Sequence, residues 1–191
     1  MIRAFLAIDL PAAWRPGLAL LIQELKKSGA EVRWVPPGNI HLTLKFFGNV
    51  PDAEVDALAQ AAREIAADAA PFKLQATAPG AFPSINNPRV VWLGLAGDLA
   101  PLEQLYRGLE QAFAPLGYPM EDRAFHPHLT LGRVKSPKGR ERLAKMLKDL
   151  PPPDWPPFQV GEIILFRSTL SSQGSVYTPL EVIPLGEDSE Q

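Results

Sequence analysis

The chain of 191 residues is long enough for one good-sized domain or two small lobes that share a core. Hydrophobic residues make up 46% and charged residues 21%, and the formal net charge of −2 excludes a generally basic surface that could coat a nucleic-acid duplex. The absence of cysteine excludes disulfides, thiolate nucleophiles and cysteine-based zinc sites, and it fits a reducing compartment.

The chain begins with an apolar, β-rich run at residues 2–9, which Pro11 ends and which is too short for a signal peptide. No later apolar run approaches the roughly 18 residues that a membrane-spanning helix requires. We therefore expect a soluble, cytoplasmic protein that does not engage a membrane.

Helix and strand patterns alternate along the rest of the chain. Apolar residues at helical spacing, bounded by Pro, Gly or capping residues, predict helices within 18–28, 51–65, 98–116 and 136–150. Apolar, β-rich runs predict strands at 2–9, 31–35, 40–47, 72–78, 89–95, 118–120, 128–134, 160–166 and 175–183. The segment 78–89 should be a loop rich in Pro, Asn and Gly, and the proline-rich segment 151–157 a stiff connecting loop.

Short turns between neighbouring strands indicate antiparallel pairing, and the fold class expected from these elements is α+β. No linker divides the chain cleanly, so we expect residues 1–186 to form a single domain of two lobes. Residues 187–191 should form a disordered acidic tail.

Two of the three histidines occur in the same four-residue pattern, His-Leu-Thr-Leu, at residues 41–44 and 128–131. The two copies start 87 residues apart, almost half the chain, and only five threonines are available in the sequence. Both copies fall in strand-like runs, so each histidine should share a sheet face with its threonine while the leucines enter a core. This HxTx repeat predicts a duplicated lobe, with two His-Thr pairs facing one another across a pseudo-two-fold cleft.

The residue types of this motif suit the chemistry of a phosphodiester. In-line hydrolysis needs a base on one side of phosphorus and an acid at the leaving oxygen opposite, and two imidazoles can supply both near neutrality. Threonine hydroxyls can donate hydrogen bonds to the non-bridging oxygens as negative charge accumulates there. No metal ion, cofactor or nucleophilic side chain is required.

Four segments together resemble the two-histidine (2H) phosphoesterase superfamily, specifically its RNA 2′,3′-cyclic phosphodiesterase branch, also called 2′-5′ RNA ligase. They are Ile2–Pro11, His41–Gly48, Pro88–Gly94 and Phe125–Arg133, and they extend over nearly the whole chain. The resemblance implies a fold of two antiparallel sheets that flank a central cleft, with helices outside.

The same resemblance implies that His41 is the proton donor, that His128 is the proton acceptor, and that Thr43 and Thr130 bind phosphate. The implied reaction is hydrolysis of terminal RNA 2′,3′-cyclic phosphates to 2′-phosphomonoesters, with 2′-5′ RNA ligation as its reverse. The implied partners are RNA ends, such as those of tRNA fragments, or cyclic nucleotides. A monomer that needs no cofactor or metal is expected.

Four further residues are weaker candidates. Arg133 is a phosphate contact by family position, but strict alternation points it away from His128, so a bulge or a strand end is needed to bring it into the cleft. Arg3 and Lys45 either add positive charge to the cleft or are solvated charges at a strand edge. Phe82 either stacks on a terminal base or anchors a loop.

Three alternatives remain open. His126 and His128 have the spacing of a metal-binding pair, and His41 could be a third ligand of a metal-dependent hydrolase, although this leaves both threonines unexplained. A non-catalytic RNA-end binding module could use the histidines only as hydrogen-bonding groups. The prolines of 151–157 could bind a partner domain instead of stiffening a loop.

Overall fold

The computed structural model describes residues 1–186, and the expected acidic tail at residues 187–191 lies outside them. Within residues 1–186 the chain forms four α-helices and nine strands, with short 3-10 turns at several of their ends. In chain order they are β1 (Ile2–Ile8), α1 (Arg15–Lys26), β2 (Val32–Trp34), β3 (Leu42–Val50), α2 (Val55–Ala67), β4 (Phe72–Ser84), β5 (Asn87–Gly97), α3 (Leu99–Phe113), β6 (His128–Val134), α4 (Arg140–Asp149), β7 (Phe158–Val160), β8 (Glu162–Ser171) and β9 (Gly174–Pro184).

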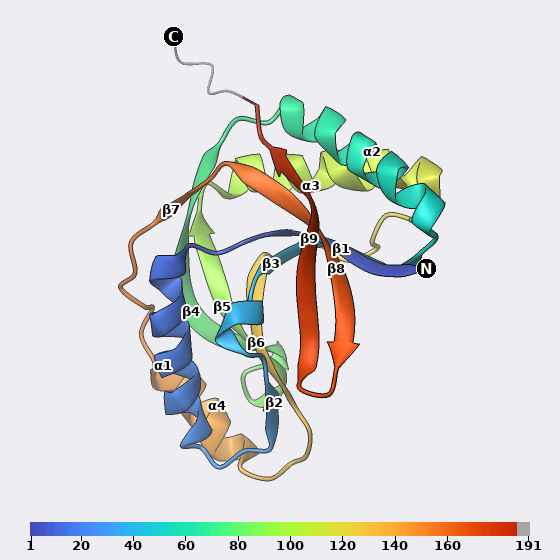
Figure 1. The fold of residues 1–191 in the computed structure, drawn as a ribbon. Coiled ribbons are helices and arrows are strands. Elements are labelled where there is room, and N and C mark those ends of the chain that lie inside the picture. The colour runs from blue at the N-terminus through green and yellow to red at the C-terminus, as the bar shows by residue number, and fades with distance from the viewer. Residues whose placement is uncertain (187–191) are drawn as a thin grey trace.

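The strands form two antiparallel sheets (Figure 1). Sheet A has the order β3-β1-β8-β9, and sheet B has the order β2-β6-β5-β4-β7. All of the strand pairings are antiparallel. The expected α+β fold with two antiparallel sheets is therefore confirmed.

The two sheets do not correspond to the two halves of the chain. Sheet A combines β1 and β3 from the start of the chain with β8 and β9 from its end, whereas sheet B contains the middle strands together with β2. The segments expected as strands before and after Pro36 thus lie in different sheets, because a 3-10 turn at Pro37–Asn39 carries the chain from one to the other. The repeated motifs are divided likewise, with the first in sheet A and the second in sheet B.

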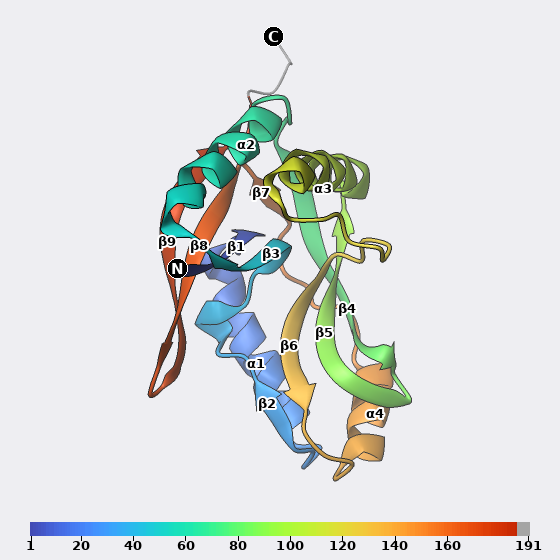
Figure 2. The same ribbon diagram turned by 90° about the vertical axis from the view of Figure 1, so that its right-hand side faces the viewer.

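Each sheet packs one face against the core and the helices. On β1, Ala4, Leu6 and Ile8 enter the main hydrophobic core, whereas Phe5 and Ala7 belong to a small separate cluster on the opposite face. Helix α2 contacts β8 and β9 of sheet A, and α4 contacts β4 and β5 of sheet B (Figure 2). The other face of sheet A carries this small apolar cluster. None of the helices within residues 1–186 has the length and apolar character that crossing a membrane would require.

Two expectations about the middle of the chain are wrong. The expected loop at 78–89 is mostly strand, because β4 extends to Ser84 and β5 begins at Asn87. Pro79 and Pro83 lie beyond the residues of β4 that pair with β7, where β4 is an edge strand and tolerates proline. The expected strand at 118–120 does not form, and the short β7 completes sheet B instead.

A buried ion pair connects β3 to α3. The Lys45 ammonium lies 2.8 Å from a carboxylate oxygen of Glu110 and donates to the carbonyl oxygen of Pro119 at 2.7 Å. The other carboxylate oxygen of Glu110 accepts the amide of Glu121 at 2.6 Å. Both charged side chains are about 95% buried, with exposed fractions of 5% and 4%. Lys45 is therefore neither a charge of the expected cleft nor a solvated charge; it stabilises the packing of β3 on α3.

The Lys45→Met substitution should lower the free energy of unfolding by about 3–5 kcal/mol, because it leaves the Glu110 carboxylate buried without its cation. The double variant Lys45→Met, Glu110→Gln should recover much of this loss, since a neutral amide still accepts the Glu121 amide proton. Urea unfolding of the two variants tests this. A loss below about 1 kcal/mol in the single variant would contradict the burial of the pair.

Candidate active site

The first motif follows the alternation predicted from the sequence. His41 directly precedes β3, and Leu42 and Leu44 are buried in the main core. Thr43 is exposed and pairs in register with Ala7 of β1, whose side chain lies on the face of sheet A opposite the core. His41 and Thr43 therefore share the face of sheet A that the core does not use.

The second motif repeats this arrangement in sheet B. His128 and Thr130 are half-buried at the start of β6, while Leu129 and Leu131 are fully buried in the core. Strands β3 and β6 contact one another, and they run along the adjoining sides of the two sheets (Figure 2). Two His-Thr pairs thus project from two sheets that meet along β3 and β6.

Aromatic rings enclose the His41 imidazole. Phe5 stacks on it with ring centroids 4.8 Å apart and an interplanar angle of 19°, and the edge of Tyr177 approaches it at 5.3 Å. Burial among these rings lowers the pKa of His41 from 6.5 to about 4, although a backbone hydrogen bond with Asn39 and the Asp9 carboxylate both act to raise it. His41 is therefore neutral at neutral pH in the free protein.

His128 has a similar but more open surround. Phe82 meets it edge-on at 5.0 Å, and the Trp92 ring lies 6.5 Å away. The indole of Trp92 covers Gly80 so closely that a Cβ there would come within 2.4 Å of it, so only glycine permits this packing. Burial is the main cause that lowers the pKa of His128 below 6.5. Phe82 thus lies in β4, beside His128, and not in a loop as expected from the sequence.

Each histidine is oriented by the backbone of the residue two positions before it. Nδ1 of His128 lies 2.6 Å from the carbonyl oxygen of His126, and His41 makes its backbone hydrogen bond with Asn39. A carbonyl oxygen can only accept, so Nδ1 of His128 carries the proton and Nε2 is free to exchange a proton elsewhere. His126 therefore serves through its backbone, which the sequence pattern alone did not indicate.

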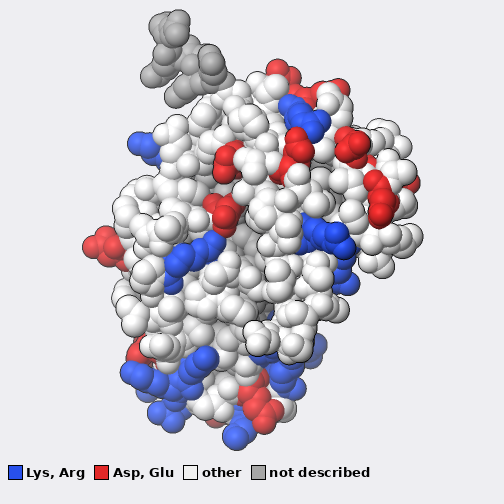
Figure 3. Space-filling model, in the orientation of Figure 1, with Lys and Arg blue, Asp and Glu red and all other residues white. Residues whose placement is uncertain are grey.

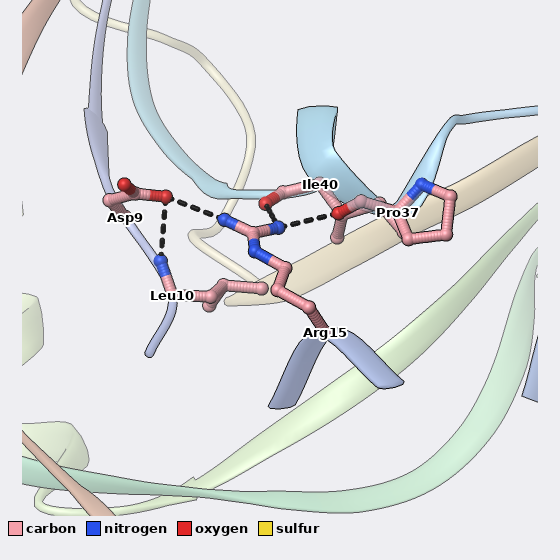
Figure 4. Close-up of polar contacts among 5 residues, drawn as sticks. All are labelled: Asp9, Leu10, Arg15, Pro37 and Ile40. Carbon is pink, nitrogen blue, oxygen red and sulfur yellow. Dashed lines mark hydrogen bonds and ion pairs between the residues drawn. The ribbon is translucent and has the colours of Figure 1, made fainter. Parts of the chain in front are cut away.

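An arginine that sequence reasoning missed fixes the turn before His41 (Figure 4). Arg15 donates from Nη1 to the carbonyl oxygens of Pro37 and Ile40, both at 2.6 Å, and from Nη2 to the Asp9 carboxylate at 2.7 Å. These bonds tie α1, the end of β1 and the 3-10 turn Pro37–Asn39 together directly before His41. No repeat or motif marks Arg15, because its partners are mostly carbonyl groups brought near by the fold.

Arg133 reaches the face of His128 through a strand irregularity. The β5 partners of Thr130 and Gly132 are adjacent residues, so Leu131 is an extra residue on β6 and the register shifts there. Arg133 is consequently exposed on the same sheet face as Thr130. Its positive charge adds to the effect of burial in lowering the pKa of His128.

The remaining candidates lie at the margins of the two faces. The Arg3 guanidinium lies over the Phe46 ring, 5.1 Å from its centroid, on an exposed part of sheet A. His126 is exposed, and within residues 1–186 no group of three His, Cys, Asp or Glu side chains has the arrangement to hold a metal ion. The geometry does not support His41, His126 and His128 as a set of metal ligands. The core-free faces of the two adjoining sheets carry two imidazoles, two hydroxyls and a guanidinium, a set suited to acid–base chemistry on an anion.

Comparison with known proteins gives consistent matches over almost the full chain. A family model described as the 2′-5′ RNA ligase superfamily matches residues 11–170. The RNA 2′,3′-cyclic phosphodiesterase of Methanothermobacter thermautotrophicus is 36% identical over 184 residues, covering 96% of this chain and 99% of that protein. The protein of the same name from Thermus thermophilus is 35% identical over 190 residues, covering 96% and 90%. The crystal structure of E. coli LigT complexed with 3′-AMP matches with a TM-score of 0.79 and 32% identity, covering 96% of this chain and 98% of LigT.

The imidazole titrations should show the effect of burial directly. By NMR, His41 of the free protein should titrate near pH 4 and His128 below 6.5. Since the unfolded chain binds more protons between pH 4 and 6.5, the His41 contribution to stability is complete above pH 6.5 and falls as the pH drops to 4, by up to about 3 kcal/mol. Urea unfolding of His41→Gln should show a smaller loss over this range. Titration of His41 at or above 6.5 would contradict the burial.

Arg15→Met should loosen the turn that precedes His41. The variant loses charge-assisted hydrogen bonds to two carbonyl groups, so amide hydrogen exchange at Asn39 and Ile40 should accelerate about tenfold or more. The pKa of His41 should move back toward 6.5 as its ring becomes more exposed. Arg107→Met is the control, because Arg107 is an exposed residue of α3 whose charge pairs with Glu103 one turn away. Unchanged exchange in Arg15→Met would show that the turn holds without the guanidinium.

Proposed function

The chain belongs to the 2′-5′ RNA ligase superfamily, and we propose that it hydrolyses the 2′,3′-cyclic phosphate at RNA ends with His41 and His128 as acid and base. It is an enzyme of the RNA 2′,3′-cyclic phosphodiesterase class, and its relatives carry that name. We propose further that residues 1–186 act as one two-lobed domain, as a monomer, in the cytoplasm.

The observation that carries this proposal is the repeated arrangement of the two histidines. Each one shares a sheet face with a threonine two residues later, and each has a backbone hydrogen bond with the residue two positions before it. At His128 the proton is held on Nδ1, so Nε2 is the nitrogen that exchanges a proton with a substrate. Two imidazoles on adjoining sheets can provide the opposed acid and base that in-line displacement at phosphorus requires.

The proposed reaction assigns one role to each residue. His128 removes a proton from water as the water attacks phosphorus, and His41 protonates O3′ as the P–O3′ bond breaks, which leaves a 2′-phosphomonoester. The hydroxyls of Thr43 and Thr130 donate to the non-bridging oxygens, where charge increases in the transition state. Arg133 adds positive charge from the His128 side. The acid, the base and the charge stabilisation are all side chains, so the proposal includes no metal ion or cofactor.

The lowered pKa values place a condition on this mechanism. Both imidazoles are neutral in the free protein at neutral pH, yet the acid must carry a proton when the leaving oxygen departs. An anionic phosphodiester bound between them favours the imidazolium form and raises its pKa again. The negative charge of the substrate therefore favours the protonated form of His41 that the acid role requires. The binding of 3′-AMP by E. coli LigT supports a site of this kind for nucleotide phosphate groups.

Microscopic reversibility extends the proposal to ligation. If a 5′-hydroxyl RNA end occupies the position of the attacking water, the same acid and base form a 2′-5′ phosphodiester. Bulk water favours hydrolysis, so ligation should have a low yield.

The test is incubation of the purified protein with an oligonucleotide that ends in a 2′,3′-cyclic phosphate, in excess EDTA, with product ends identified by phosphorus NMR. We expect a 2′-phosphate product. His41→Ala and His128→Ala should each reduce turnover at least about a hundredfold. The double variant should lose much less than the product of the single losses, because the pair acts as one unit. His126→Ala is the control and should retain activity, because only its backbone carbonyl is used.

Each contrary outcome has a separate meaning. A predominant 3′-phosphate product would require His41 and His128 to exchange their roles. Activity lost in EDTA and restored by zinc, together with a collapse in His126→Ala, would favour the metal-dependent alternative. Binding of the oligonucleotide without any turnover would favour a non-catalytic RNA-end module.

A further inference from the structure

Two arginines lie side by side on the sheet face that carries His128. Arg33 of β2 and Arg133 of β6 are directly paired in the antiparallel register, and both are exposed. Val32 and Trp34, on either side of Arg33, pack against the core, so the Arg33 side chain points away from it. The two guanidinium groups therefore extend from neighbouring strands on the same face as Thr130.

This pairing is unfavourable in the protein alone. Like charges directly opposite one another destabilise an antiparallel sheet. Within residues 1–186 neither arginine forms a salt bridge with a carboxylate. An anion bound between the two groups would convert the repulsion into two charge-assisted hydrogen bonds.

The surroundings of the pair are also basic, although the net charge of the chain is −2. Figure 3 shows Lys and Arg side chains concentrated at the end of the molecule where α1 ends and β2 and α4 begin, whereas Asp and Glu predominate near α2 and α3. Strand β6 runs from His128 toward this basic end (Figure 2). Arg133 follows His128 by five positions, a distance of about 15 Å along the strand.

We propose that Arg33 and Arg133 together form a subsite for the internucleotide phosphate on the 5′ side of the terminal nucleotide. This inference rests on the proposed function, because the 3′-terminal cyclic phosphate would occupy the histidines and the rest of the RNA must leave on the 5′ side. Arg133 acts on both positions, since its charge also reaches His128. Arg33, one strand further out, contacts only the internucleotide phosphate. The subsite makes an oligonucleotide end a better substrate than a cyclic mononucleotide.

The experiment compares Arg33→Gln with the wild type on two substrates. One is a trinucleotide that ends in a 2′,3′-cyclic phosphate, and the other is the nucleoside 2′,3′-cyclic monophosphate with the same terminal base. With the trinucleotide, kcat/KM should fall about tenfold and the slope of log kcat/KM against log salt should flatten by about 0.7, as for one lost contact to single-stranded nucleic acid. With the mononucleotide, kcat/KM should not change.

Arg142→Gln is the matched control. Like Arg33→Gln, it removes one positive charge near sheet B. Arg142, however, is an exposed residue of α4, which packs against the other face of that sheet. The control should leave both substrates unaffected. Arg33→Gln should also have an unchanged or higher melting temperature, since it removes a like-charge contact, and this separates a lost subsite from a damaged fold.

A binding measurement tests the subsite even if the wild-type protein turns over neither substrate. Dissociation constants are measured for a trinucleotide that ends in a 2′-phosphate and for the corresponding nucleoside 2′-monophosphate. Absence of turnover on both substrates by the wild type would refute the proposed function, whereas a weaker trinucleotide affinity in Arg33→Gln would still support the subsite. An equal effect of Arg33→Gln on both ligands, or no effect on the trinucleotide, would overturn it.

Discussion

The alternation of side chains along two strands is the constraint from which the site follows. Leu42 and Leu44 on β3, and Leu129 and Leu131 on β6, are buried in one continuous core. Because a one-residue slip would exchange the two faces of a strand, burying these leucines fixes the opposite direction for each histidine and threonine. The positions of the chemically useful groups thus depend on apolar burial that has no part in the chemistry.

This constraint is also why the sequence could predict that each histidine shares a sheet face with its threonine, whereas it could not predict the groups around them. The pattern His-Leu-Thr-Leu is local, and it indicated correctly that His41 and Thr43 share a face. The assignment of strands to sheets depends on contacts between distant segments, so the pairing of β1 with β8 was not visible. Arg15 was missed for the same reason, because its partners are mainly carbonyl groups that carry no signature in the sequence.

The sequence indicated what the position of Arg133 depends on, but it could not show whether that condition is met. Arg133 could reach the face of His128 only if β6 departed from regular alternation, and the extra residue at Leu131 provides that departure. Lys45 shows the opposite case. Its place in a strand of alternating pattern suggested an exposed charge, but Glu110 offers a buried carboxylate that makes its burial tolerable.

The two motifs are nearly identical, so any difference in role between the histidines must come from their surroundings. Burial lowers both pKa values, but the nearby charges differ in sign. The Asp9 carboxylate acts to raise the pKa of His41, against a smaller opposing effect of Arg15, whereas Arg133 acts to lower that of His128. Burial opposes this difference at His41, whose pKa is about 4. The proposed roles therefore require the bound phosphodiester to raise the pKa of His41 above that of His128, so its negative charge must lie close to the His41 ring. Asp9 and Arg133, which lie outside the repeated motif, act in the same direction.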